Sequence, residues 1–161
     1  MPKNISKIVG ELLLKKQMTV AVAESCSGGL LSGLITDTPG SSFYFLGGVV
    51  AYDNRVKTSL LNISTEFLKK SGAVSPGIAA KMAQNIRKRL KTDYGLGITG
   101  IAGPSGGSRA KPVGLVYIAL ASKKEIWARK YIFLGKRSTV RTRAAREALN
   151  LLRLELLKND H

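Results

Sequence analysis

Ser25 stands between an apolar run and a pair of glycines, a position that suits a nucleophile. The run MTVAVA at 18–23 is rich in small and β-branched residues and predicts a buried strand. Gly28 and Gly29 follow and lead into a helical pattern. Ligand crevices of open α/β sheets form at the carboxyl ends of strands, and helix N-termini present free N–H groups to anions. Ser25 is therefore a candidate nucleophile, with the backbone amides from Ser27 to Gly29 as its oxyanion hole.

A simpler role competes for the serines of this turn. Serine is a preferred helix N-cap, and position alone favours Ser25 or Ser27 as a cap over Ser25 as a nucleophile. Cys26 is a second possible nucleophile, but the chain offers no nearby histidine to form a thiolate pair. We expect Cys26 to be a small buried packing residue.

The sequence contains a single histidine, the final residue His161, where chain ends usually fray. A Ser-His-Asp or Cys-His arrangement is therefore excluded. One cysteine and ten scattered acids make a zinc site unexpected, so we predict no metal. The sequence also lacks a Walker A loop and a G-x-G-x-x-G turn after its first strand. A serine nucleophile in this chain must be activated by lysine or tyrosine.

Tyr52 and Lys57 are the candidates for that activation. Tyr52 closes a strand expected at 43–52, and Lys57 lies on a short helix expected at 54–61. Burial and neighbouring cations lower the pKa of a lysine and turn it into a usable base, and a nearby tyrosine could relay the proton or orient the serine. Taken singly, each residue also fits an ordinary role, as a solvated lysine and a strand-end aromatic.

A glycine-rich loop follows Thr99, which ends a strand expected at 94–99. The loop GIAGPSGGSRAKP includes Gly100 and Gly103, and such glycine density lets the backbone approach a ligand and present amides to phosphate. Loops of this length in compact domains are usually functional or mobile. We expect this loop to contact a ligand.

Basic residues flank the start of the last expected helix. Lys136, Arg137 and Arg141 could clamp a phosphate, or they could continue a solvated helix face. Arg137 is the preferred candidate because it lies at the helix start, where anions bind.

The bulk composition describes one folded domain, which we place at 1–161. Hydrophobic residues make up 44% of the chain, and its mean hydropathy is +0.03. No apolar run reaches the roughly 18 residues that span a bilayer. Glu11, Lys15 and Lys16 interrupt the first apolar stretch, so we expect neither a signal peptide nor a membrane anchor. The lone cysteine excludes an internal disulfide and indicates the cytoplasm.

The formal charge of +16 favours anionic partners. These are either phosphorylated small molecules or nucleic acid. The basic residues are spread from Lys3 to Lys158, and only 6% of residues are aromatic. That pattern gives little support to a specific RNA-binding surface, so nucleic-acid binding is expected to be unspecific at most.

Hydrophobic periodicity predicts helices and strands that alternate at first and end in a hairpin. The expected helices lie at 5–16, 30–37, 54–61, 65–70, 76–90 and 138–157, and the expected strands at 18–23, 43–52, 94–99, 113–122 and 125–134. The last two strands are joined so tightly that they should pair antiparallel. This order predicts an α/β domain with a mixed sheet flanked by helices.

Six segments of the chain resemble the nicotinamide-nucleotide amidase family, also called the CinA C-terminal domain. They occur in the family's order and spacing and cover nearly the whole chain. The segments are AVAESCSGG (21–29), ITDTPGSS (35–42), FLGGVVAYDNRVK (45–57), GAVS (72–75), ITGIAGPSGGS (98–108) and KPVGLVYIAL (111–120).

The resemblance implies a three-layer α/β/α domain that converts nicotinamide mononucleotide to nicotinic acid mononucleotide and ammonia, without metal or organic cofactor. It implies a serine nucleophile with a lysine and a tyrosine, which correspond to Ser25, Lys57 and Tyr52. It assigns substrate contacts to Thr99 and Arg137. It also implies a homodimer. Some family members carry an additional nucleotide-pyrophosphatase domain, which these 161 residues do not contain.

Four positions depart from the family pattern. They are Ser27 in place of threonine, Asp53 in a Tyr-Ser-Asn pattern, Leu115 in place of threonine, and Lys136 in place of an acid or asparagine. None removes a proposed catalytic group, although Asp53 adds a charge near Lys57. The alternative hypothesis is a non-catalytic module that keeps this fold and binds nucleotides or nucleic acid.

Overall fold

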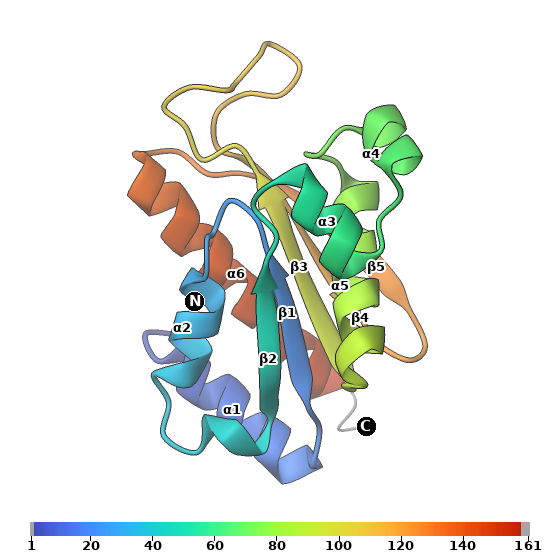
Figure 1. Cartoon of the computed structure of the whole chain (residues 1–161). Helices are drawn as coiled ribbons and strands as arrows, with labels where there is room; N and C mark the ends of the chain where they lie inside the picture. Colours follow the sequence, from blue (N-terminus) through green and yellow to red (C-terminus); the bar gives the residue numbers. More distant parts are fainter. Residues whose placement is uncertain (1, 159–161) are drawn as a thin grey trace.

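A mixed five-stranded sheet forms the centre of the domain in the computed structural model, which describes residues 2–158 (Figure 1). The strands are β1 (Val20–Glu24), β2 (Phe45–Val50), β3 (Tyr94–Gly100), β4 (Leu115–Ala121) and β5 (Ile126–Ile132). Their order in the sheet is β2-β1-β3-β4-β5. β1 pairs in parallel with β2 and β3, whereas β4 pairs antiparallel with β3 and β5. The predicted α/β fold with a mixed sheet is confirmed.

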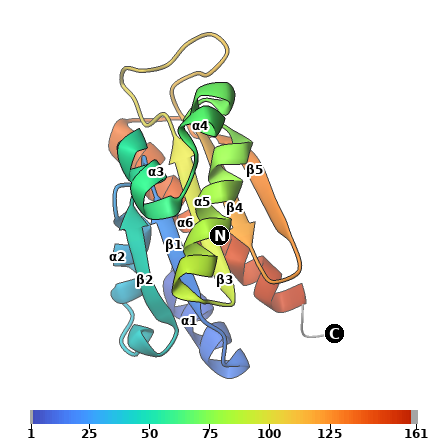
Figure 2. The ribbon, with the colours of Figure 1, turned by 45° about the vertical axis from the view of Figure 1, so that its right-hand side comes forward.

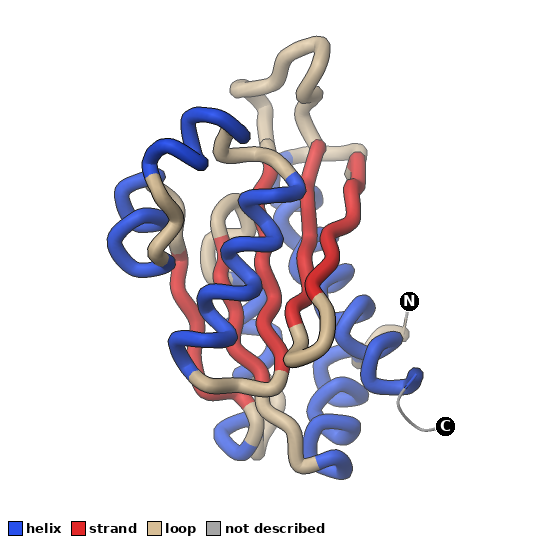
Figure 3. The backbone as a smooth tube through the Cα atoms, turned by 90° about the vertical axis from the view of Figure 1, so that its right-hand side faces the viewer, coloured by secondary structure: helices blue, strands red, loops and turns tan. Residues whose placement is uncertain are grey.

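Helices cover both faces of the sheet, which gives the three layers that the resemblance implied (Figures 1 and 2). One layer contains α1 (Ile5–Lys16), α2 (Leu30–Thr36) and α6 (Arg137–Lys158). The other contains α3 (Asn54–Leu61), α4 (Thr65–Ser71) and α5 (Pro76–Leu90). In Figure 3, α5 runs across the front of the sheet. The 3₁₀ turn η1 (Ser41–Phe43) precedes β2.

Side-chain size alternates along β1 and separates two apolar cores. Val20 and Val22 face α1, α2 and α6, whereas Ala21 and Ala23 belong to the core beneath α5. Gly95 and Gly97 of β3 complete this flat surface, because a Cβ at either position would collide with a backbone carbonyl of α5. Small residues therefore let α5 lie directly on the strands.

The structure differs from the sequence expectations only at the ends of elements. β2 is shorter than the strand expected at 43–52, since residues 41–43 form the 3₁₀ turn and the pairing with β1 ends at Val50. Helix α6 begins at Arg137. The two hairpin strands pair antiparallel as predicted but are each trimmed to seven residues. His161 lies outside the described residues. No helix within residues 2–158 is long and apolar enough to cross a membrane.

Candidate active site

The parallel strands bring three of the predicted residues to one edge of the sheet. Ser25 directly follows β1, Tyr52 lies two residues beyond β2, and Thr99 is near the end of β3. The backbone N–H of Ser25 donates to the carbonyl of Ile98 at 2.9 Å, so β3 holds the serine in place. Convergence at this edge follows from the parallel pairing.

Lys57 reaches Ser25 from α3 on the other side of the site. The Asp53 carboxylate caps α3 by accepting from the N–H of Arg55 at 2.8 Å, and Lys57 follows one turn later on the buried face. Lys57 is only 1% exposed, and its Nζ donates to the Ser25 Oγ at 3.2 Å. The chain thus pairs a hydroxyl with a buried amine and no histidine.

Burial lowers the pKa of the Lys57 ammonium, because the interior penalises the charged form. The negative charge of Asp53 opposes this shift to a smaller extent. Two backbone carbonyls accept from Nζ, that of Ala51 at 2.8 Å and that of Tyr52 at 3.4 Å. A neutral amine has two N–H donors for these carbonyls and one lone pair left for the Ser25 hydroxyl. This arrangement suits Lys57 as a general base for Ser25.

Glu24 occupies the helix N-terminus that the sequence analysis assigned to an oxyanion. Its fully buried carboxylate accepts from the N–H groups of Gly29 (3.1 Å), Leu31 (3.0 Å) and Ser32 (2.8 Å), and from the Ser32 hydroxyl (2.8 Å). Because a carboxylate already satisfies these donors, the start of α2 is not open to a second anion.

The expected oxyanion hole at Ser27 to Gly29 is therefore wrong for the two glycines. The Gly28 N–H donates to the Ser25 carbonyl at 3.0 Å, and the Gly29 N–H is bound by Glu24. Neither glycine nor Ser27 lines the cavity beside Ser25. A charged residue at the end of an otherwise apolar strand was the signal in the sequence that pointed to Glu24.

A cavity of about 290 Å³ opens above Ser25 and Lys57. Apart from the residues of the turn at 27–29, its walls include the other predicted site residues, namely Tyr52, Thr99, Gly100, Gly103 and Arg137. They also include Asn54, Ala73 and Val74, which the sequence analysis did not single out. Asn54 begins α3, and the other two residues lie in the connection between α4 and α5.

Two hydrogen bonds join the glycine-rich loop and β3 to that connection. The Thr99 hydroxyl donates to the carbonyl of Ala73 at 2.7 Å, and the Lys111 ammonium donates to the carbonyl of Val74 at 2.8 Å. The Thr99 hydroxyl is therefore engaged in fixing the cavity wall. Lys111 gives the long loop a defined attachment in place of free movement.

Arg137 closes the mouth of the cavity together with Tyr52. Its guanidinium donates to the carbonyl of Gly103 and to the Tyr52 hydroxyl, both at 2.7 Å. Tyr52 is 59% exposed, and within the described chain its hydroxyl bonds to Arg137 rather than to Ser25 or Lys57. The proposed proton relay through the tyrosine hydroxyl has no hydrogen bond to support it here. The Tyr52 backbone, in contrast, contacts Lys57 directly.

Arg141, which could have clamped a phosphate together with Arg137, does not line the cavity. It donates to the carbonyls of Cys26 and Ser27, each at 3.2 Å, and so fastens α6 to the turn after Ser25. A Cβ at Gly28 would lie 2.8 Å from this guanidinium, and Gly28 has a φ of +57°. Glycine is thus required here for backbone geometry and for the close approach of Arg141.

The CinA C-terminal domain family matches residues 2–156 of the chain. The chain belongs to this family. It is 51% identical over 147 residues to a putative competence-damage inducible protein of Desulforudis audaxviator, a match that covers 91% of the chain and 36% of that protein. It is 47% identical over 156 residues to a CinA-like protein of Desulfotalea psychrophila, covering 97% of the chain and 38% of the relative. The chain therefore spans little more than a third of the length of these relatives.

Solved structures of CinA proteins share the fold. A CinA superfamily protein of Klebsiella pneumoniae superposes with a TM-score of 0.93 at 26% identity, covering 98% of this chain and 99% of that one. A competence/damage inducible protein of Agrobacterium tumefaciens reaches a TM-score of 0.90 at 34% identity, with 98% of both chains covered. The three-layer architecture of this CinA domain is thus that of its family.

The thiol of this CinA domain is poorly suited to nucleophilic attack. Burial raises the pKa of Cys26 to about 12, so the thiolate is scarce at neutral pH. Within residues 2–158, no three His, Cys, Asp or Glu side chains gather where they could hold a metal ion. The geometry therefore favours Ser25 over Cys26 as the candidate nucleophile.

Proposed function

We propose that this CinA domain hydrolyses the carboxamide of nicotinamide mononucleotide to nicotinic acid mononucleotide and ammonia. The observation that carries the proposal is the contact of 3.2 Å between the Ser25 hydroxyl and the buried Lys57 amine. A serine next to a lysine of lowered pKa is an arrangement that performs acyl transfer without histidine. The substrate itself rests on the family resemblance.

The reaction proceeds as two acyl transfers. Neutral Lys57 takes the hydroxyl proton of Ser25 as Oγ attacks the carboxamide carbon. The π electrons of the substrate carbonyl move to its oxygen, which gives a tetrahedral intermediate. When this intermediate collapses, its C–N bond breaks. Lys57 gives the proton to the leaving nitrogen, which departs as ammonia. Water then attacks the acyl-enzyme ester, with Lys57 accepting its proton, and the ester C–O bond breaks. Ser25 recovers that proton, and water is the only co-reactant.

The cavity offers a separate place for each part of the substrate. The carboxamide faces Ser25 at the closed end, and the ribose lies along the glycine-rich loop around Gly100 and Gly103. The phosphate lies at the mouth, where it exchanges the neutral partners of Arg137 for its own oxygens in a charge-assisted pair. The backbone N–H groups of Gly28 and Gly29 already donate to other acceptors. We therefore assign the oxyanion to other backbone amides, first of all to that of Cys26, which directly follows the nucleophile.

An ammonia-release assay on nicotinamide mononucleotide, free nicotinamide and NAD tests the proposal. We expect turnover of the mononucleotide and its loss in Ser25→Ala, with the far-UV spectrum and the melting temperature unchanged. Normal turnover by Ser25→Ala would show that another group is the nucleophile. Release from none of the three amides would reject the activity.

The charge of +16 supports one alternative, a non-catalytic module that binds nucleotides or nucleic acid. Salt-sensitive binding to any DNA or RNA sequence, without deamidation, is the result that this alternative predicts.

We also propose that the domain works in the cytoplasm as a homodimer. The first part rests on the single unpaired cysteine and the second on the resemblance. Sedimentation of the purified chain tests the second part.

A further inference from the structure

A second cleft lies beside α5, away from Ser25. It encloses about 520 Å³ between the C-terminal end of α3 and the outer face of α5. Its polar lining consists of Asn62, Lys81, Gln84, Asn85, Lys88 and Arg89, and it shares no lining residue with the cavity above Ser25. The cleft is therefore a separate feature of the domain.

The chemistry of the cleft is that of an anion site. Three cations and three amides line it, and no lining residue is acidic. Lys81, Lys88 and Arg89 are exposed, and none forms a salt bridge with another residue of the described chain. Their charges are available to a ligand, whereas Arg141 is bound to the carbonyls of Cys26 and Ser27.

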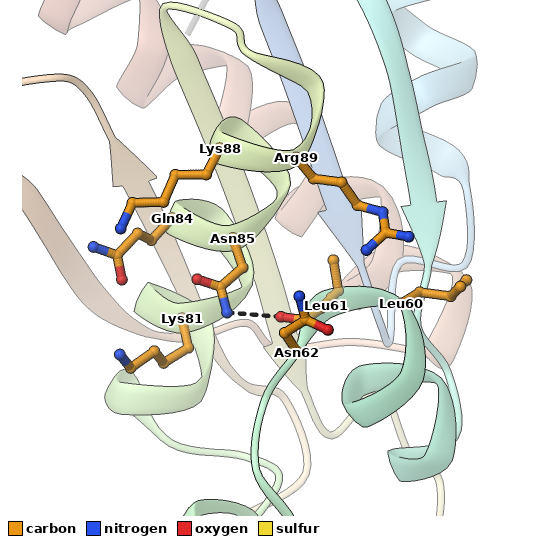
Figure 4. A pocket seen from close by; sticks show the side chains of 8 residues that line it. All are labelled: Leu60, Leu61, Asn62, Lys81, Gln84, Asn85, Lys88 and Arg89. Carbon is orange, nitrogen blue, oxygen red and sulfur yellow. Dashed lines mark hydrogen bonds between the residues drawn. The ribbon is translucent and has the colours of Figure 1, made fainter.

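A hydrogen bond forms the floor of the cleft. The Asn85 Nδ2 donates to the carbonyl of Leu61 at 2.7 Å, which ties α5 to the end of α3 (Figure 4). In Figure 4 the side chains of Lys81 and Lys88 extend to one side of this bond and that of Arg89 to the other. A ligand that crosses the floor meets positive charge on both sides.

The cleft continues into a smaller hollow beside Phe67. This hollow, of about 260 Å³, shares Asn62, Lys81 and Asn85 with the cleft, so the two form one groove. The half-buried Phe67 ring packs over Gly77, where a Cβ would lie 3.1 Å from it. An aromatic side chain at one end of a basic groove is suited to stacking a base.

The spacing of two lysines along α5 suits a ligand that carries more than one phosphate. Lys81 and Lys88 are seven residues apart on α5, which corresponds to about 11 Å along the helix. We infer that the groove binds a nucleotide with two or more phosphates, its base at Phe67 and its phosphates among Lys81, Lys88 and Arg89. This site is independent of the proposed amidase activity, whose substrate carries a single phosphate.

Calorimetric titration of the full chain with ATP, AMP and tripolyphosphate, in metal-free buffer of moderate salt, tests the inference. The variant Lys81→Gln/Lys88→Gln/Arg89→Gln should weaken ATP binding by about tenfold or more, because it removes the charge-assisted contacts. The control Lys15→Gln/Lys124→Gln/Lys130→Gln loses the same charge from exposed positions elsewhere and should change the Kd less than about twofold. Equal weakening by both triple variants, or no binding of ATP, would overturn the site.

Two further measurements identify the ligand class. Phe67→Leu should weaken ATP but leave tripolyphosphate binding unchanged, whereas equal effects would remove the base from the assignment. Ser25→Ala should bind ATP as the unmodified chain does, which separates this result from the amidase assay. If a short single-stranded oligonucleotide binds through the three cations and ATP does not, the groove takes a nucleic-acid backbone and the nucleotide assignment is wrong.

Discussion

Glu24 and Lys57 are two buried ionisable side chains on opposite sides of Ser25, and their surroundings differ. Glu24 is fully buried, and its carboxyl group receives four hydrogen bonds from N–H and O–H donors. Lys57 is 1% exposed and has only neutral oxygen partners, so burial lowers its pKa. Equal burial thus accompanies a carboxyl group fixed by four donors in one case and an amine of lowered pKa in the other.

Replacing Lys57 should have the largest effect on activity. Lys57→Met keeps the length of the side chain but removes the base, and we expect kcat for ammonia release to fall by about 10³-fold or more. Arg129→Met, on the exposed strand β5, is the control and should retain activity. Turnover within tenfold of normal in Lys57→Met would mean that another group activates Ser25.

The same variant should be more stable, and the gain should depend on pH. The pKa of Lys57 is lower in the folded chain than in the unfolded chain. At a pH between these two pKa values, the unfolded state therefore binds more protons than the folded state. At neutral pH, Lys57 therefore lowers the free energy of unfolding, and this loss disappears only as the pH rises toward 10.5. Thermal unfolding should show a larger gain for Lys57→Met at pH 7 than at pH 10, and a loss of stability at both would contradict the comparison.

Replacing Glu24 should destabilise the fold. Glu24→Ala leaves buried donors at the start of α2 without a partner, and we expect a cost of about 3 kcal/mol in the free energy of unfolding. Glu24→Gln retains one accepting oxygen but turns an NH₂ group toward donors, so its cost should be about 2 kcal/mol. Urea denaturation measures both. A change below 0.5 kcal/mol in Glu24→Ala, by the same order-of-magnitude scale, would show that water replaces the carboxylate.

Arg137 should affect the phosphate more than the chemical step. Arg137→Gln should raise KM for nicotinamide mononucleotide by about tenfold while changing kcat little, because it removes a charge-assisted pair of about 1.4 kcal/mol. Hydrolysis of a substrate without phosphate should not change. An equal loss with both substrates would place Arg137 in the chemical step.

The smallest effect should come from Asp53, which raises the pKa of Lys57 against the effect of burial. Asparagine also caps helices well, so Asp53→Asn should keep α3 intact. Because activity requires the neutral amine, kcat/KM should rise with pH through the pKa of Lys57. Asp53→Asn should move this rise to lower pH, and a shift to higher pH would contradict Lys57 as the base.

Much of the fold was predictable because it depends on local pattern. The period of apolar residues located the helices and strands, and the positions of Ser25, Tyr52 and Thr99 at strand ends predicted a shared edge. The roles of Gly28 and Gly29 were not predictable in this way. Their amides look free at a helix start, and only the side chain of Glu24 shows that the donors of α2 are already satisfied.

The sequence by itself determined the α/β pattern, the excess of positive charge and the lack of an internal histidine. These properties depend on residue type and spacing alone. Only the tertiary structure decided that Lys57 is buried against Ser25, that Arg141 is bound to backbone carbonyls, and that Arg137 lies at the mouth of the cavity. The physical reason is that a long charged side chain takes its pKa and its partners from segments that are distant in the chain. From the sequence alone, Lys57 on its eight-residue helix would be predicted to be a solvated surface residue, because its burial depends on the neighbouring sheet.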